Sequence, residues 1–426
     1  MITIGIRGMH PVLSLIGAAL LCSGLMRLHA PAHAGTADLS ALTAEQRLGE
    51  SLFFDTTLSR PGGQSCGSCH SPSVAFTDPN KNSPTSAGVH ANLFGSRNAP
   101  TAMYSAYSPV FRFDTDIQDY VGGQFLDGRA ATLEDQAMAP FLNPIEMANP
   151  DRASVIQKLR DGPNAAAFLS VHGANALTDV DHAYDLLVKT LASYERSPAL
   201  SPFSSKYDAY LAGKATLTTR ETHGLQLFED PAKGNCAACH SSQASANGTP
   251  PLFTDFTYDN IGVPRNTASL FYTLPAALNP DGSAFIDLGL GGTTGDSADN
   301  GRFKVGTLRN VALTGPYTHN GYFNDLWQVV DFYNTRDIKP VCISPFTSAD
   351  QAERLGCWPA AELPGTVNHD ELGNLGLTAA DVDDIVAFLG TLTDGFAADQ
   401  VAAVEPGTLS LLLMGVLGLG VWRRHR

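Results

Sequence analysis

The sequence predicts an all-α protein built from two similar domains. An internal repeat is the first reason: the segments Thr43–Gln46 (TAEQ) and Gly49–Phe53 (GESLF) return as Thr218–Glu221 (TTRE) and Gly224–Phe228 (GLQLF). A Cys-x-x-Cys-His motif follows each copy, which is the second reason. The third is the length of 426 residues, because one hydrophobic core rarely organises a chain of that size.

Each copy of the repeat is expected to open with a capped helix. The hydroxyl groups of Thr43 and Thr218 can accept from the first turn, and Gln46 and Glu221, three residues later, can reach back to the Thr backbone. This is the capping-box pattern. The apolar residues that follow have the spacing of one buried helix face, namely Leu48 and Leu52 in the first copy and Leu225 and Phe228 in the second.

Each half is also expected to close with an amphipathic helix, over 183–195 and over 378–392. Each half is thus expected to contain an opening helix, a loop with the Cys motif and a closing helix. The Ser- and Pro-rich stretch 197–205 marks the boundary between the halves. The expected organisation is a leader, a first domain, a second domain and a tail, at 1–34, 35–200, 201–395 and 396–426.

The N-terminal residues have the features of a secretory signal peptide. Arg7 precedes the apolar run 11–26, and the small-x-small pattern at 32–34 predicts cleavage just before Gly35. The mature protein is therefore expected outside the cytoplasm, in the periplasm or beyond it.

A second apolar stretch, 409–422, lies near the C-terminus and is followed by the basic residues 423–426. It is shorter than the roughly 20 residues that span a bilayer comfortably. With the Val-Glu-Pro-Gly motif at 404–407 it resembles the PEP-CTERM sorting tails of Gram-negative bacteria, although Pro-Glu-Pro is the usual motif. The alternative is a simple membrane anchor. Either interpretation places the protein at a membrane surface.

The formal net charge of −15 argues against nucleic acid as a partner, because a protein that neutralises phosphates needs a basic face. The same charge suits a basic protein partner, such as a small electron carrier. The sequence leaves open whether the chain is a monomer or a homodimer.

The six cysteines outside the leader fall into two groups. Cys342 and Cys357 lie in a Pro-rich stretch, and in an oxidising compartment we expect them to form a disulfide. The other four belong to the two motifs, Cys66–His70 and Cys236–His240. Two thiols at this spacing add to the vinyl groups of one haem, and the adjacent His binds its iron. A single motif could be half of a zinc site, but two motifs behind matching helices in an exported chain favour two c-type haems, with Cys66, Cys69, Cys236 and Cys239 as attachment sites and His70 and His240 as proximal ligands.

With these motifs the chain resembles the bacterial diheme cytochrome c peroxidase family, which includes the MauG-type enzymes. The resemblance covers about 42–393, and the segments that carry it are Arg97–Pro100, Phe125–Ala130, Asn143–Met147 and Phe303–Phe332, the last of which includes Leu308–Val311 and Pro316–His319. It implies two cytochrome c-like domains, each with one covalent haem.

The resemblance further implies that the first haem reacts with peroxide. Glu146 would be the catalytic base, with Gln136 beside it; taken alone, Glu146 would be a helix-terminal surface carboxylate. His90 matches a loop histidine that, in many family members, caps this iron until the other haem is reduced. Taken alone, His90 would be a solvated loop side chain.

The second haem is expected to differ from that of many relatives. Peroxidases of the family often use Met as its sixth ligand, but this chain has no Met between Met147 and Met414. Tyr333 occupies the matching position, which is the MauG-type choice and implies a low potential. The alternative is that Tyr333 is a core residue and that this iron is five-coordinate or bound by His. Leu126 stands where the family commonly has a Trp between the haems, and Trp327 and Trp358 do not match that position.

The resemblance also implies one calcium ion between the domains, near Asn98, Thr314 and Pro316. The expected activity is reduction of hydrogen peroxide with electrons from a small donor protein, a cytochrome c or a cupredoxin. The alternatives are a MauG-like oxidase, in which high-valent iron oxidises a protein or organic substrate, and a non-catalytic electron carrier.

Overall fold

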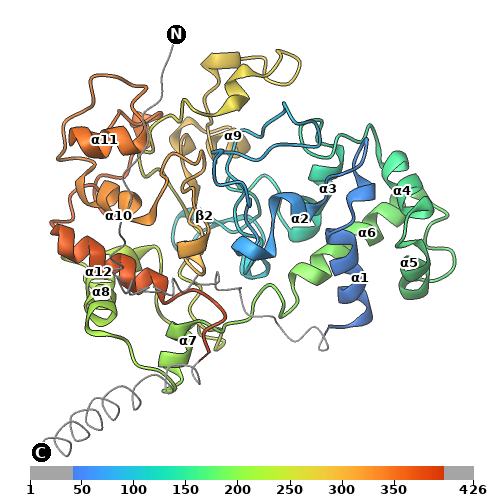
Figure 1. Ribbon diagram of the computed structural model, residues 1–426, viewed down its shortest axis with the longest axis horizontal. Coiled ribbons are helices and arrows are strands. Elements are labelled where there is room, and N and C mark those ends of the chain that lie inside the picture. Colours follow the sequence, from blue (N-terminus) through green and yellow to red (C-terminus); the bar gives the residue numbers. More distant parts are fainter. Residues whose placement is uncertain (1–41, 398–426) are drawn as a thin grey trace, which may run out of the picture. The chain divides into compact units, whose positions relative to one another are not determined.

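The computed structural model describes residues 42–397, in which helices predominate (Figure 1). The helices of the first half are α1 (Ala44–Phe53), α2 (Cys66–Cys69), α3 (Leu133–Leu142), α4 (Arg152–Asp161), α5 (Ala165–His172) and α6 (Val180–Glu195). Those of the second half are α7 (Lys206–Leu211), α8 (Thr219–Glu229), α9 (Gly291–Thr294), α10 (Leu326–Thr335), α11 (Ala349–Leu355) and α12 (Ala379–Gly390). The predicted leader and most of the predicted tail lie outside the described residues.

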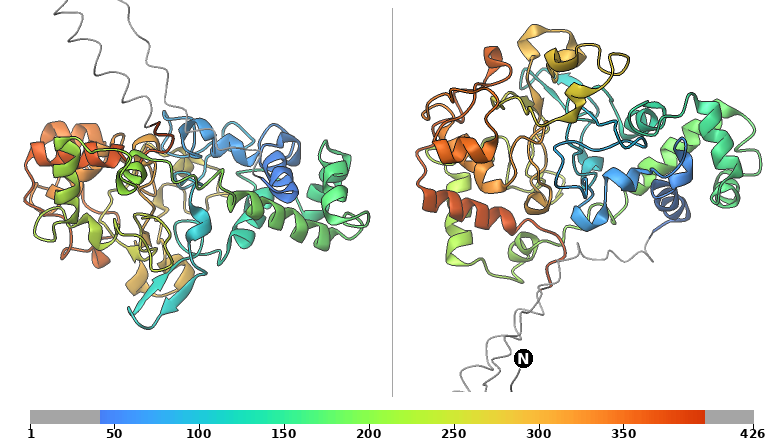
Figure 2. Two further views of the ribbon diagram at one scale, coloured as in Figure 1. Left: turned by 90° about the horizontal axis from the view of Figure 1, so that it is seen from below. Right: turned by 45° about the horizontal axis from the view of Figure 1, so that its top comes forward.

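Short strands supplement the helices. Strands β1 (Arg112–Asp114) and β2 (Asp119–Val121) form an antiparallel hairpin that stands out from the helices in Figure 2. Strands β3 (Tyr258–Asp259) and β4 (Phe303–Lys304) pair antiparallel, with Tyr258 opposite Lys304.

The predicted capping boxes are present. Thr43 Oγ1 accepts from the backbone N–H of Gln46 at 3.2 Å, and Gln46 Oε1 accepts from the N–H of Thr43 at 3.0 Å. Thr218 and Glu221 repeat this exchange at the start of α8, at 3.3 and 2.7 Å. Each pair satisfies two backbone donors that would otherwise lack a partner in the first turn. These local interactions begin α1 and α8 where the repeat predicted.

The closing helices also form, although α6 begins three residues before the expected start at 183. The Asp179 carboxylate accepts from the N–H of His182 at 2.8 Å and so caps an additional turn. At the start of α12, Thr378 and Asp381 form a further capping box.

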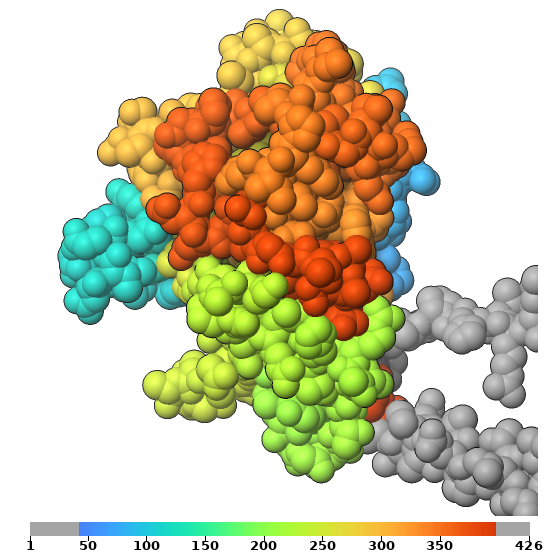
Figure 3. All heavy atoms as spheres, turned by 90° about the vertical axis from the view of Figure 1, so that its left-hand side faces the viewer, coloured from blue at the N-terminus to red at the C-terminus, as the bar shows by residue number. Residues whose placement is uncertain are grey.

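The opening and closing helices of each half pack together through a glycine. A Cβ atom added to Gly49 of α1 would lie 2.3 Å from the Thr190 carbonyl oxygen of α6. One added to Gly224 of α8 would lie 1.9 Å from the Asp384 carbonyl oxygen of α12. The repeated glycine therefore permits the same close helix crossing twice. Figure 3 shows the second pair from outside, with α12 in red against the green α8.

Buried apolar residues gather in three clusters. The first lies among α1, α3, α4, α5 and α6, and its last member is Leu200. The second begins at Tyr207 and lies among α7, α8, α10 and α12. The third joins α10 to the loop 340–358 through Phe332 and Trp358, whose rings are 5.2 Å apart. The clusters change at 200–207, but residues 42–397 fall within one compact unit, so the two-domain division stays a prediction.

The predicted disulfide is present between Cys342 and Cys357, while the four motif cysteines are free. Within 42–397 no helix has the length and apolar character needed to cross a membrane.

Candidate haem sites and active site

The two Cys-x-x-Cys-His motifs have the same backbone arrangement. The first forms the one-turn helix α2, and the second begins with a 3₁₀ turn over Cys236–Ala238. In both, the N–H of the His donates to the carbonyl oxygen of the first Cys, at 2.9 Å for His70 and at 2.9 Å for His240. A single helical turn places residues i and i+3 on one face, so the two thiols of each motif face the same side.

Each motif histidine is fixed by a backbone carbonyl. His70 Nδ1 lies 3.0 Å from the Phe76 oxygen, and His240 Nδ1 lies 2.8 Å from the Phe253 oxygen. When Nδ1 carries the proton and donates it, Nε2 is the free nitrogen, which is the usual arrangement of a metal-binding imidazole. Burial lowers the pKa of both rings and so favours the neutral, ligating form.

The four motif thiols have raised pKa values. Burial is the main cause that raises the pKa of Cys66, Cys69, Cys236 and Cys239 to about 12. A charged thiolate is therefore disfavoured at all four positions, and none of the four is engaged in a disulfide.

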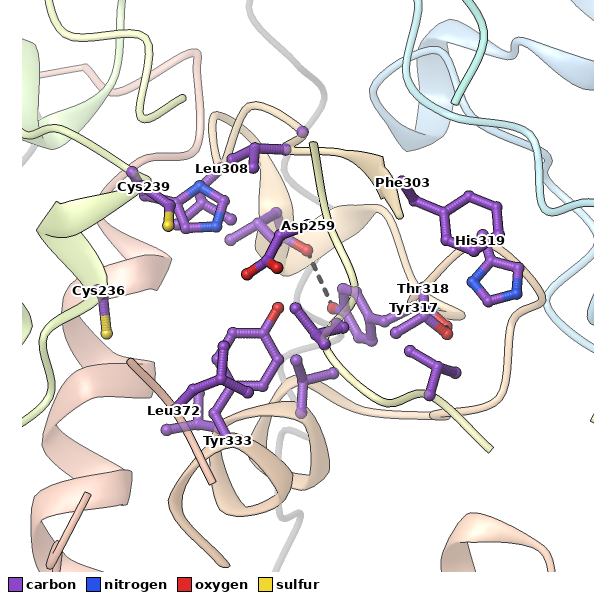
Figure 4. Close-up of a pocket in the computed structure, with 18 of the residues that line it drawn as sticks. Cys236, Cys239, Asp259, Phe303, Leu308, Tyr317, Thr318, His319, Tyr333 and Leu372 are labelled. Carbon is purple, nitrogen blue, oxygen red and sulfur yellow. Dashed lines mark hydrogen bonds between the residues drawn. The ribbon is translucent and has the colours of Figure 1, made fainter. Parts of the chain in front are cut away.

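A cavity adjoins the second motif and fits a haem. Cys236, Cys239 and His240 line it together with Tyr333. The rest of the wall is largely apolar, and includes Phe228, Val263, Leu308, Val311, Val330, Leu372, Leu377, Ile385 and Leu389. Figure 4 shows Cys236 and Cys239 at one end and Phe303 with His319 at the other. Two thiols, an imidazole and apolar walls are the groups that hold a c-type haem.

Tyr333 lies on α10 and its hydroxyl points into this cavity, toward Asp259 (Figure 4). Burial, followed by the nearby Cys239 and Asp259, raises the pKa of its phenol. The phenol is thus neutral without a metal, and it would have to lose its proton to bind iron as phenolate.

Glu146 lies beside the first motif. Asn143 Nδ2 donates to Glu146 Oε1 at 2.7 Å, which fixes the carboxylate. Burial raises the pKa of Glu146, while the charge of Arg129 and the Asn143 hydrogen bond oppose the rise. The charge of Glu146 in turn contributes to the raised pKa values of Cys66 and Cys69, so the carboxylate lies within electrostatic range of both thiols.

Gln136 and His90, the other two residues predicted for this site, are less closely connected to Glu146. Gln136 is half-buried on α3, and its side chain makes no hydrogen bond within 42–397. His90 is exposed in a loop. That loop is held against the Glu146 segment, because the N–H of Val89 donates to the Glu146 carbonyl oxygen at 2.8 Å. The structure therefore brings the His90 loop, although not its ring, to Glu146.

The three residues predicted for calcium all line the large cavity. The Asn98 side-chain amide donates to the Pro316 carbonyl oxygen, and Thr314 lies two residues before Pro316. No cluster of three or more His, Cys, Asp or Glu suited to a metal occurs in the part of the chain that the structure describes. A cation here would depend on carbonyl and amide oxygens, which Ca²⁺ accepts.

Leu126, in place of the expected Trp, also lines the cavity. Neither described tryptophan does so. Trp327 Nε1 donates to Asp383 at 3.1 Å, and the buried Trp358 donates to Thr335 at 3.0 Å.

Two features at the cavity escaped the sequence analysis, namely an ion pair to the lining residue Asp287 and a lysine of the lining itself. Arg97 forms a bidentate ion pair with Asp287, at 2.6 Å for each bond, and contacts Asp127 at 2.7 Å. The second feature is Lys304, a lysine of β4 that lines the cavity. Arg97 lies in a segment that carried the family resemblance, but its partner lies 190 positions away, and no local pattern joins the two.

Comparison with known proteins shows the family to which this chain belongs. A model of the di-haem cytochrome c peroxidase family matches residues 43–216. MauG, the methylamine utilization protein of Paracoccus denitrificans, is 40% identical over 386 residues, which cover 88% of this chain and 95% of that protein. The chain belongs to the di-haem cytochrome c peroxidase and MauG family.

Further relatives of this family carry the peroxidase name. Cytochrome c551 peroxidase of Nitrosomonas europaea is 32% identical over 74% of this chain and 80% of that protein. The crystal structure of the diheme peroxidase BthA of Burkholderia thailandensis superposes with a TM-score of 0.70 at 35% identity, covering 83% of this chain and 87% of that one.

Membership confirms the predicted fold class, which is mainly helical with cytochrome c-like domains, and makes the protein a haem-peroxidase-type oxidoreductase with haem c as its cofactor. It does not separate the peroxidases from MauG.

Proposed function

We propose that the protein reduces hydrogen peroxide to water at the first haem, with electrons that enter through the second haem from a small cytochrome c or cupredoxin. The observation that carries this proposal is the half-buried Glu146 beside the first motif, with its carboxylate held by Asn143. A plain electron carrier has no use for a hydrogen-bonded carboxylate of raised pKa at that place. On this proposal the haems are attached through Cys66 and Cys69 and through Cys236 and Cys239.

A haem held at Cys66, Cys69 and His70 would supply the iron and the electrons that cleave the O–O bond of peroxide. The contribution of the protein is proton transfer. Ionised Glu146 accepts a proton from one peroxide oxygen and returns it to the departing oxygen. Asn143 holds Oε1 by its 2.7 Å hydrogen bond, so the carboxylate is already oriented before substrate arrives. Gln136 completes the polar side of the pocket.

The His90 loop is the proposed gate of this site. Its backbone is tied to the Glu146 segment through Val89, so a movement of the loop would displace the base as well as the His90 ring. Calcium bound near Asn98, Thr314 and Pro316 would stabilise the same region. We further propose that the protein is exported to the periplasm, with its C-terminal tail at a membrane, and that the chain is divided into domains over 35–200 and 201–395.

A MauG-like oxidase is the second candidate. Tyr333 favours it, because the phenol reaches the cavity of the second motif, and a phenolate ligand stabilises oxidised iron. Leu126 weakens it, because the position lacks the aromatic ring that would carry charge between haems. The substrate of such an oxidase would be a protein or an organic molecule.

Stopped-flow absorbance with hydrogen peroxide tests the proposal on holoprotein, fully oxidised and after reduction by one electron. Reaction only after one-electron reduction supports a gated peroxidase, whereas rapid reaction of the oxidised form supports the MauG-like oxidase. No reaction in either state would leave an electron carrier.

Two variants test the role of Glu146 directly. Glu146→Gln should slow the reaction about 10²- to 10⁴-fold, the usual contribution of a general base. Glu353→Gln is the matched control, because this residue is exposed on α11. Equal rates in the two variants would refute the role of Glu146.

A further inference from the structure

Lys304 is a half-buried lysine that lines the cavity beside the second motif. It is the last residue of β4, next to Phe303, which Figure 4 shows at the end of the cavity opposite Cys236 and Cys239. Its Nζ donates to the Gly123 carbonyl oxygen at 2.6 Å and lies 3.5 Å from Ser108 Oγ. Both partners are neutral.

No carboxylate in the described part of the chain forms an ion pair with this amine. Asp127 is the acidic residue whose charge acts on Lys304, but it already pairs with Arg97 at 2.7 Å and with Arg129 at 2.9 Å. Burial lowers the pKa of Lys304 to about 8. An ammonium group removed from water without a counter-charge is costly, so the site favours an anionic ligand.

Among the described residues that line the cavity, Lys304 is the only Lys or Arg. Four carboxylates share the lining, those of Asp259, Asp287, Glu362 and Glu371. Two of the four are already paired, Asp287 with Arg97 and Glu362 with Arg265. A haem adds two propionate carboxylates to this acidic cavity. Lys304 lines the cavity and its ammonium bonds only to neutral groups, so that ammonium and an incoming carboxylate would each supply the charge that the other lacks.

Cys236 and Cys239 would hold a haem at one end of the cavity, through its two vinyl groups. The propionates lie on a different edge of a haem from the vinyl groups. They would therefore be directed away from the two thiols, and Phe303 of β4 lies at the end of the cavity opposite these thiols.

We propose that the ammonium group of Lys304 binds a propionate of the second haem and thereby raises the reduction potential of that haem. The inference rests on the haem placement given under the proposed function, but not on peroxide chemistry. A positive charge beside a haem favours the ferrous state, because ferric iron carries one more positive charge. Lys304 would thus oppose the low potential that a Tyr333 phenolate imposes.

Spectroelectrochemical titration of the holoprotein tests this proposal. Lys304→Gln removes the charge but keeps an amide donor for Gly123, and Lys304→Met is a second neutral variant if the glutamine variant does not fold. Lys304→Arg keeps the charge. Lys214→Gln is the matched control, because Lys214 is exposed and does not line the cavity. Tyr333→Phe identifies the redox wave of the second haem, since it alters a residue on the wall of that cavity.

We expect the wave identified by Tyr333→Phe to move to lower potential in Lys304→Gln or Lys304→Met, to remain near the wild-type position in Lys304→Arg, and to be unchanged in Lys214→Gln. A neutral variant that leaves this wave in place, or one that moves only the other wave, overturns the proposal. Peroxide turnover is measured separately. If the two-haem protein shows no peroxide turnover, the proposed peroxidase function is refuted. The redox titration would still decide whether Lys304 raises the potential of the second haem.

Discussion

At the scale of single residues, the environment of Glu146 predicts how the rate of the peroxide reaction depends on pH. The base must be ionised to accept a proton, and burial raises its pKa above the ordinary value of 4.5. The rate of the peroxide reaction should therefore fall as the pH drops through this raised pKa, with a midpoint above 4.5. A pH series of stopped-flow rates on the reactive form measures it.

A change at Arg129 provides a second test of the role of Glu146. Its positive charge opposes the rise in the Glu146 pKa, so Arg129→Gln should move the acid limb of the rate profile to higher pH. Glu146→Gln should abolish that limb altogether. An acid limb that persists unchanged in Glu146→Gln would show that another group controls it.

At the scale of helices, the two repeated glycines make a prediction about stability. A Cβ atom on Gly224 or Gly49 would meet a backbone carbonyl of the partner helix at 1.9 or 2.3 Å, and a backbone cannot move aside as a flexible side chain can. Gly224→Ala and Gly49→Ala should each lower the free energy of unfolding by about 1–3 kcal/mol, the usual cost of overpacking. Urea unfolding measures the loss.

Gly390 offers the control for these two variants. It is the last residue of α12, and a Cβ atom there would meet nothing within 4 Å. Gly390→Ala should leave stability unchanged or raise it by up to about 1 kcal/mol, because alanine is the better helix former. Equal losses in all three variants would show that the close crossings do not explain the glycines.

At the scale of the whole molecule, the net charge of −15 predicts how turnover depends on salt. The electric field of an acidic protein attracts a basic donor, and salt shortens the reach of that field, to about 8 Å at 0.15 M ionic strength from about 30 Å at 0.01 M. With a basic cytochrome c as donor, kcat/KM should fall as salt is added over this range. With a neutral dye as donor it should not. A flat profile with the basic cytochrome would exclude electrostatic steering.

The sequence predicted those parts of the molecule that depend on neighbouring residues. The capping boxes at Thr43 and Thr218 lie within four residues, and the haem motifs lie within five, so their patterns are visible without a fold. The start of α6 was missed because its cap, Asp179, stands four residues ahead of the predicted start at 183. Periodicity shows which face a helix buries, but it does not show which side chain ends the helix.

The contacts around the cavity could not be predicted from such local patterns. The ion pair of Arg97 with Asp287 and the bond from Lys304 to Gly123 each join residues more than 180 positions apart. These contacts exist only once both halves have folded, so a single sequence contains no local sign of them. The family resemblance directed attention to Glu146 and Tyr333. Lys304 lies within the matching segment Phe303–Phe332, but the sequence did not single it out.

The state of the six described cysteines has a consequence for how the protein is made. Cys342 and Cys357 are joined and close a loop beside α10, whereas Cys66, Cys69, Cys236 and Cys239 are free. On the proposed haem attachment, the same compartment must oxidise one pair and keep two other pairs reduced until haem arrives. A host that expresses this chain therefore needs an oxidising folding pathway and a reducing haem-ligation pathway at once. Production that supplies only the first would yield protein in which premature disulfides occupy the attachment sites.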